Sequence, residues 1–177
     1  MHFLYVGAEV TVGSLIVNYL MQADVLGFGA EQAGKHVPLY WGGAMVGRFV
    51  GAYLLRVFSP GKVLAGAAAM AVLLFAVSIA AAGPTAGWAL LAIGLFNSIM
   101  FPTIFTLASE GLGARAAEGS GLICVAIVGG AIVPLVTGFA ADLTTLRLSL
   151  IVPALCYLVI LAFGWYARRP YNETITG

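Results

Sequence analysis

The chain has 177 residues, of which 62% are hydrophobic and 8% are charged, and its formal net charge is +1. A soluble domain carries about 25% charged residues, so this composition excludes an ordinary soluble fold and predicts a membrane protein. The nearly neutral charge also argues against a nucleic-acid partner, which calls for a basic surface.

Six apolar segments fill most of the chain. Each is about long enough to cross a hydrocarbon core of about 30 Å as a helix, the form that satisfies backbone polar groups inside lipid. We therefore predict an all-α, polytopic membrane helix bundle of six transmembrane helices over residues 1–169, followed by a short tail over residues 170–177. The predicted spans are residues 3–21, 37–57, 62–82, 86–108, 119–140 and 147–167.

The first span carries a carboxylate, Glu9, about two turns from its start. A charge inside the bilayer costs at least about 2.5 kcal/mol, so this side chain needs a partner, a proton or water. On another face of the same helix lie Thr11, Ser14 and Asn18. We interpret Ser14 and Asn18 as candidate substrate-binding residues.

The second span contains the opposite charge, Arg48. At 1.5 Å per residue, Glu9 and Arg48 lie about 9 and 13 Å from the same membrane face. We predict that they form an ion pair or share one polar network. Two roles stay open: a gate or coupling element, or a static pair that locks two helices together.

The fourth span combines polar and aromatic residues near mid-membrane, including Asn97, Ser98 and Phe101. Hydrogen-bonding groups beside aromatic rings suit a sugar, which offers hydroxyls and an apolar face. These three residues are therefore candidate substrate contacts. The alternative is that Asn97 and Ser98 bond to neighbouring helices and hold the bundle together.

Small residues recur at four-residue spacing in the second and fifth spans. This weak internal repeat suggests two three-helix units, an arrangement common in transporters, although such stripes also simply allow close helix packing. The residues are Gly43, Gly47 and Gly51 in one span and Ala126, Gly130, Pro134 and Gly138 in the other.

Basic residues are unevenly divided between the two ends of the helices. The positive-inside rule then places both chain ends in the cytoplasm of a multi-pass inner-membrane protein, with Tyr19, Tyr40, Trp41 and Trp88 at the outer interface. One side has Arg56, Lys62, Arg115, Arg168 and Arg169, and the other has Lys35 and Arg147.

Several segments together resemble the C-terminal half of a major facilitator superfamily transporter, in particular the fucose/glucose/galactose–proton symporter family. Each segment is weakly specific, but their common order covers the chain to about Arg169. The segments are Phe3–Val10, Gly13–Ser14, Asn18–Leu20, Tyr40–Gly51, Phe96–Phe105, Gly119–Leu122 and Ile127–Pro134.

The resemblance implies twelve helices in two six-helix halves, with a hexose or 6-deoxyhexose of the fucose, glucose or galactose type bound between them. These six spans would be helices seven to twelve and would form the C-terminal wall of an alternating-access pathway. Helices seven and ten line the cavity in such a fold, which favours Asn18 and Asn97 as ligand contacts. Coupling to protons, or to sodium, is implied too, but the family's proton-carrying carboxylates are attributed to the other half, so Glu9 does not inherit that role.

Beyond a sugar, a proton and membrane lipid, the expected partner is a missing N-terminal half or a second copy of the chain. We favour a partial chain because Met1 directly precedes the first span. A different class remains open, a six-helix substrate-binding subunit of an energy-coupled importer. An enzyme is not expected, because the sequence has no Gly-x-Ser-Gly motif and no membrane-embedded histidine to activate a serine. Cys124 and Cys156 lie inside spans and predict neither a metal site nor a cofactor.

Overall fold

The computed structural model describes residues 1–109 and 116–167, and within this part all regular elements are helices. The expected all-α bundle is confirmed, and each long helix overlaps one predicted span. The helices are α1 (His2–Met21), α2 (Ala30–Gly34), α3 (Val37–Val57), α4 (Pro60–Ala80), α5 (Pro84–Ser109), α6 (Ala116–Leu143), α7 (Leu146–Ser149) and α8 (Ile151–Ala167).

Prolines and one glycine mark the helix starts and a sharp turn. Pro60 and Pro84 open α4 and α5, where the missing N–H of proline costs nothing because the first helical N–H groups are unpaired anyway. Gly83, in the turn between these helices, has φ 71°, a conformation that favours glycine. Its N–H donates a 2.8 Å hydrogen bond to the carbonyl of Asp24.

Five helices of the described part are long and apolar enough to cross a membrane, namely His2–Met21, Pro60–Ala80, Pro84–Leu107, Cys124–Leu143 and the continuous stretch Leu146–Ala167. The remaining predicted span, residues 37–57, corresponds to α3, which is equally long, but Arg48, Arg56 and its glycines lower its hydropathy. It nevertheless packs along the membrane-spanning α5. The chain is therefore a multi-pass membrane protein.

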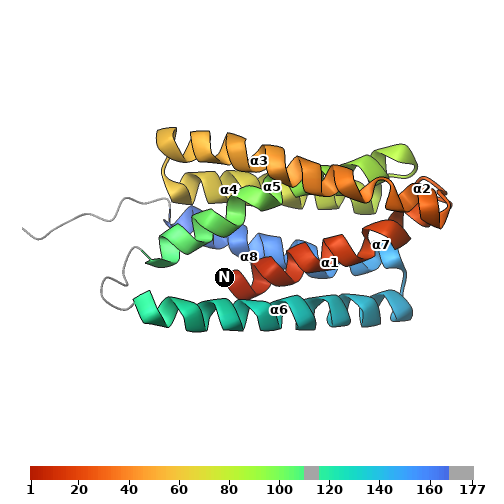
Figure 1. Cartoon of the computed structure of the whole chain (residues 1–177). Coiled ribbons are helices and arrows are strands. Elements are labelled where there is room, and N and C mark those ends of the chain that lie inside the picture. The colour runs from red at the N-terminus through yellow and green to blue at the C-terminus, as the bar shows by residue number, and fades with distance from the viewer. Residues whose placement is uncertain (110–115, 168–177) are drawn as a thin grey trace, which may run out of the picture.

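The long helices pack in a pattern that repeats (Figure 1). Helix α1 packs on α6 as α5 packs on α3, α4 packs on α5 as α8 packs on α1, and α4 and α8 contact each other. Exchanging α1, α3 and α4 with α5, α6 and α8, in that order, therefore converts the first two pairs into each other, does the same for the next two, and leaves the α4–α8 pair unchanged. The short helices α2 and α7 lie at one end of the bundle, and this arrangement of two three-helix units agrees with the repeat in the sequence.

Glycines allow close packing in the pairs α1–α6 and α3–α5. A Cβ added at Gly7 on α1 would lie 2.8 Å from the carbonyl oxygen of Gly129 on α6. On the other pair, a Cβ at Gly94 would come within 2.9 Å of the Tyr40 ring. The small residues thus allow backbones to approach, as expected for helices without a hydrophobic driving force between them.

Candidate functional site

The side chain of Asn97 on α5 is the centre of a buried polar network. Its Nδ2 donates a 2.7 Å hydrogen bond to the hydroxyl of Tyr40 on α3, and its Oδ1 accepts one from the hydroxyl of Tyr157 on α8. The hydroxyl of Tyr5 on α1 donates a 2.8 Å bond to the Asn97 backbone carbonyl. One asparagine therefore joins four helices.

The network has no access to the surrounding solvent or lipid. Asn97 is 0% exposed, and each of the three tyrosines is at most 1% exposed. Inside a low-dielectric interior, an unpaired amide or hydroxyl is costly, so full pairing makes the network rigid. We name these four side chains, Tyr5, Tyr40, Asn97 and Tyr157, the asparagine hub.

Glu9 adjoins the asparagine hub. Its carboxyl lies near the Tyr5 hydroxyl, which itself donates to the Asn97 carbonyl, and Arg48 is near enough for its charge to act on Glu9. Tyr40 and Tyr157 also lie close enough to Glu9 to interact electrostatically with its carboxylate. The structure describes both Glu9 and Arg48, and they do not form an ion pair within 4 Å. The ion pairs in the described part of the chain are Lys35–Glu31 and Arg147–Asp24. A direct pair is thus absent in this conformation, and the two charges interact over a longer distance.

The predicted substrate contacts fall into two groups. Asn97 and Ser98 are interior, and the Ser98 hydroxyl donates a 3.1 Å bond to the Leu95 carbonyl of its own helix. Ser14, Asn18 and Phe101 are exposed. Asn97 therefore acts between helices here, the alternative interpretation of its chemistry. The Ser14 and Asn18 side chains face outward, whereas the Phe101 ring is in contact with the rings of His2 and Tyr5.

The exposed polar residues of α1 lie on one side of that helix. Ser14 and Asn18 are four residues apart and follow the exposed Val10 at the same spacing, so they form one stripe along the helix. Glu9, which is half-buried, lies on another face of the same helix. The arrangement can present hydrogen-bonding groups to a ligand on one side and the asparagine hub on the other.

Sequence analysis missed the three tyrosines of the asparagine hub. Tyr40 was expected at the outer interface together with Tyr19, but both side chains are buried, whereas Trp41 and Trp88 are about half exposed. The available signal was a hydroxyl inside an apolar helix, which usually finds a partner. Which partner it finds depends on helix packing, which no single helix encodes.

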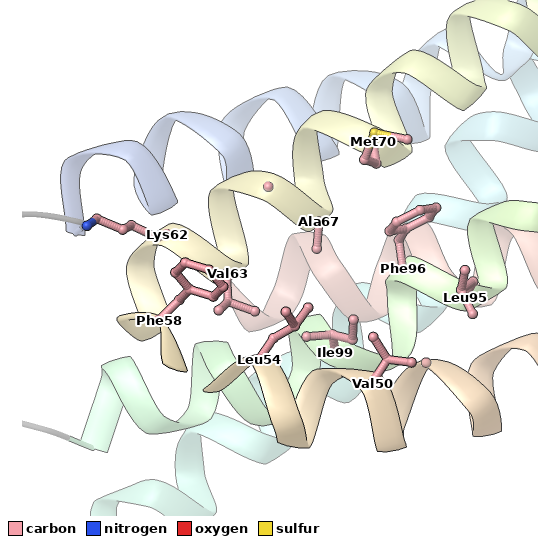
Figure 2. Close-up of a pocket in the computed structure, with 12 residues that line it drawn as sticks. Val50, Leu54, Phe58, Lys62, Val63, Ala67, Met70, Leu95, Phe96 and Ile99 are labelled. Atoms are coloured by element: carbon pink, nitrogen blue, oxygen red, sulfur yellow. The ribbon is translucent and has the colours of Figure 1, made fainter. Parts of the chain in front are cut away.

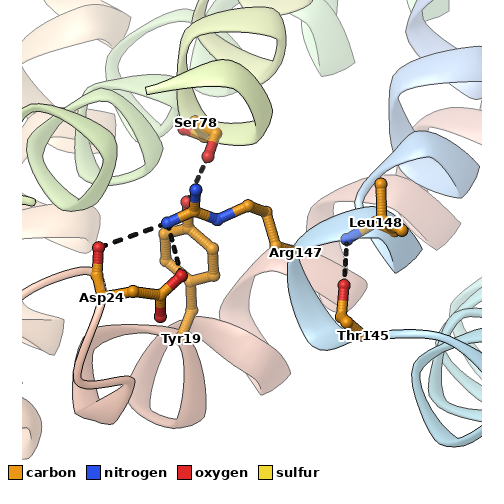
Figure 3. A network of polar contacts seen from close by, with 6 residues as sticks. All are labelled: Tyr19, Asp24, Ser78, Thr145, Arg147 and Leu148. Atoms are coloured by element: carbon orange, nitrogen blue, oxygen red, sulfur yellow. Dashed lines mark hydrogen bonds and ion pairs between the residues drawn. The ribbon is translucent and has the colours of Figure 1, made fainter. Parts of the chain in front are cut away.

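A second polar cluster lies at the end of the bundle where α2 and α7 are found (Figure 3). Arg147 of α7 forms a 2.8 Å ion pair with Asp24 and donates a 3.2 Å bond to its backbone carbonyl. The Tyr19 hydroxyl donates to the carbonyl of Ser78 on α4. These contacts hold α1, α4 and α7 together where the chain leaves the helices.

The described residues contain no group of three or more His, Cys, Asp or Glu side chains able to hold a metal ion. Cys124 and Cys156 are free thiols. The polar chemistry of the described helices is therefore hydrogen bonding by amides and hydroxyls, with Glu9 as a carboxyl in contact with it.

Two curated relatives match most of this chain. It is 51% identical over 162 residues to the glucose/galactose transporter of Brucella abortus biovar 1 (strain 9-941), covering 92% of this chain and 39% of the relative. It is 36% identical over 168 residues to the L-fucose-proton symporter of Escherichia coli (strain K12), covering 94% of this chain and 38% of the relative. The chain thus spans about two fifths of the length of these relatives. No protein-family model matches it.

A solved structure has the same fold. The crystal structure of a Major Facilitator Superfamily transporter, FucP, in the outward conformation aligns with a TM-score of 0.89 and 34% sequence identity. The alignment covers 95% of this chain and 41% of FucP. The relatives are transporters rather than enzymes.

Proposed function

The chain belongs to the major facilitator superfamily and matches one half of its fold, and from this membership we propose that it forms the C-terminal wall of a sugar pathway. The transported molecule is a hexose or 6-deoxyhexose, and transport occurs by alternating access between this wall and a second one. The second wall is a missing six-helix half or another copy of the chain. The two relatives, whose names specify glucose, galactose and L-fucose, support the sugar class.

The exposed stripe on α1 is the observation that carries the proposal. Ser14 and Asn18 offer a hydroxyl and an amide, the groups that bind sugar hydroxyls. The exposed Phe101 of α5, whose ring lies against His2 at the start of α1, offers an aromatic surface nearer the other end of that helix. The asparagine hub fixes α1 and α5 to each other at the level of Tyr5. A rigid wall is what rocking of two halves requires.

Proton coupling in this half would act through Glu9 and Tyr5. The Tyr5 hydroxyl has one hydrogen, and it donates this hydrogen in a hydrogen bond to the Asn97 carbonyl. An ionised Glu9 can only accept a hydrogen bond and therefore competes with that carbonyl for the same proton, whereas a protonated Glu9 can donate to the Tyr5 oxygen. Protonation of Glu9 thus favours the bond between α1 and α5. Tyr40 and Arg48 on α3 and Tyr157 on α8 are the other titratable or charged groups that act on Glu9 or respond to it.

The proposed location is the inner membrane with both termini in the cytoplasm. Arg56 and Lys62 lie at one end of the bundle, where α3 ends and α4 begins, and the predicted excess of Lys and Arg belongs to that end. Arg115, Arg168 and Arg169, which contribute to this excess, lie outside the described residues.

A chimera tests the function. This chain replaces the matching segment of the Brucella abortus transporter, and cells lacking their own carriers are assayed for uptake of labelled glucose, galactose and L-fucose. Uptake is expected, because the replaced segment is 51% identical, and Ser14→Ala with Asn18→Ala should reduce it. Normal membrane insertion without uptake of any of the sugars contradicts the proposal. Uptake into vesicles that contain the present chain alone would identify a second copy as the other wall.

A further inference from the structure

An apolar groove lies between α3 and α4 with α5 as its floor (Figure 2). Its volume is ≈ 510 Å³. The two helices that form its sides contact each other far less than each contacts α5, so the groove is open along its length. Of its lining residues, Lys62 alone is charged or polar.

The groove has the length of one bilayer leaflet. On α3 it extends from Gly47 to Phe58, which is about 16 Å at 1.5 Å per residue. Half of a hydrocarbon core of about 30 Å is about 15 Å. The groove therefore runs from a helix end, where Phe58 and Lys62 lie, to near the middle of the membrane, where Leu95 and Phe96 lie.

The charge is at the end where a lipid headgroup would sit. Lys62 is exposed in the first turn of α4, and Figure 2 shows its nitrogen directed away from the apolar side chains. No acidic residue in the described part of the chain forms an ion pair with it. A lysine at a membrane interface attracts anionic lipids, whereas a partner helix in this groove would have to bring its own acidic group to the same point.

We propose that this groove binds one acyl chain of an anionic phospholipid whose phosphate pairs with Lys62. The inference depends on the membrane embedding of the helices and not on the transported sugar. A lipid in this position fills the space between α3 and α4 and supports α3, which has a lower hydropathy than the other long helices.

The test measures lipid that stays bound to the protein. The protein is reconstituted into vesicles with equal amounts of phosphatidylglycerol and phosphatidylcholine of identical acyl chains, extracted gently and analysed by mass spectrometry. We expect phosphatidylglycerol to be retained over phosphatidylcholine by about fivefold, the preference that one interfacial lysine supplies. Lys62→Gln should bring the ratio close to one. Arg56→Gln, at the same end but outside the groove lining, should leave most of the preference.

A second pair of variants tests the acyl chain. Gly66 lines the groove, and a Cβ added there meets nothing within 4 Å, so Gly66→Leu fills the groove without a clash from its first carbon. It should reduce retention of both lipids severalfold, while Gly138→Leu on α6, equally open at its Cβ, should not. Equal retention of the two lipids by the unmodified protein overturns the proposal. It is overturned too if Gly66→Leu and Gly138→Leu retain the same lipid, or if a protein chain rather than lipid is cross-linked into the groove.

Discussion

The hydroxyl of Tyr5 donates a 2.8 Å hydrogen bond to the backbone carbonyl of Asn97, 92 positions later in the chain. This bond connects α1 and α5, the two helices that carry all of the candidate substrate contacts. Because both residues are buried, water cannot replace either partner. The bond makes the position of α5 dependent on α1. The nearby Glu9 carboxyl interacts with Tyr5 and can therefore affect this bond.

Replacing the amide at the centre of the asparagine hub should destabilise the protein. Asn97→Leu leaves the Tyr40 and Tyr157 hydroxyls without their partner, and each buried unpaired group costs about 1–3 kcal/mol. We expect a clearly lower midpoint of thermal unfolding in detergent. Asn18→Leu is the control, since the same change at an exposed amide should have little effect. Equal midpoints for the two variants would show that the asparagine hub does not stabilise the fold.

Removing the ionisable group of Glu9 should alter the pH dependence of transport. Glu9→Gln keeps the size and supplies an N–H donor at every pH, so it imitates the protonated carboxyl. We expect sugar uptake by the chimera to vary less between pH 5 and pH 8 than with Glu9 present. Asp142→Asn, an exposed carboxylate at the end of α6, should preserve the original profile. An unchanged profile in Glu9→Gln would exclude a coupling role for this carboxyl.

Glu9 and Tyr5 should act as one unit. Because their side chains are close enough to interact, changes at the two positions are not expected to add. A double-mutant cycle with Glu9→Gln and Tyr5→Phe should give a coupling free energy between about 0.5 and 3 kcal/mol in chemical unfolding. A cycle with Tyr5→Phe and the distant Asp142→Asn should give a coupling near zero. Additive effects in the first cycle would mean that the two groups do not interact.

The α1–α6 contact should not accept even a methyl group. A Cβ at Gly129 would lie 2.9 Å from the Cα of Phe3, so Gly129→Ala must separate two backbones. Overpacking of this kind costs about 1–3 kcal/mol, which should lower the unfolding midpoint. Gly138→Ala on the same helix meets open space and should gain slightly from the better helix propensity of alanine. If both variants unfold alike, the helices are less closely packed than described.

The two ion pairs formed among the described residues should differ in their contribution to stability. Arg147 and Asp24 are 20% and 61% exposed and join distant parts of the chain, whereas Lys35 and Glu31 are 69% and 85% exposed within one short helix. Exposed pairs are worth at most about 1 kcal/mol and are screened by salt. We expect Arg147→Gln to lower the unfolding midpoint more than Lys35→Gln, and the difference to persist at high salt. A difference that disappears in salt would assign it to surface charge alone.

The sequence determined that the chain lies in a lipid bilayer, its fold class and the approximate positions of its helices. Low charge and six apolar segments predict membrane helices because lipid leaves the backbone few other ways to satisfy its hydrogen bonds. The helix starts at Pro60 and Pro84 lie two residues from the predicted ones, and the quoted segments identified the transporter family that the comparisons support. Single residues were less informative: Asn97 was recognisable as unusual, but both a ligand contact and a helix contact fitted it.

Only the tertiary structure decided which of these polar residues meet. The asparagine hub takes its side chains from four helices, and they meet only if each helix has the right rotation about its axis and the right depth. The apolar pattern of the sequence does not fix either quantity, because nearly every face of these helices is apolar. The same reason explains Glu9 and Arg48: equal depth was predictable, but the absence of a direct ion pair depends on how α1 and α3 are turned. Composition fixes that a chain enters the membrane, whereas close contacts at glycines and buried hydroxyls fix how its helices are arranged.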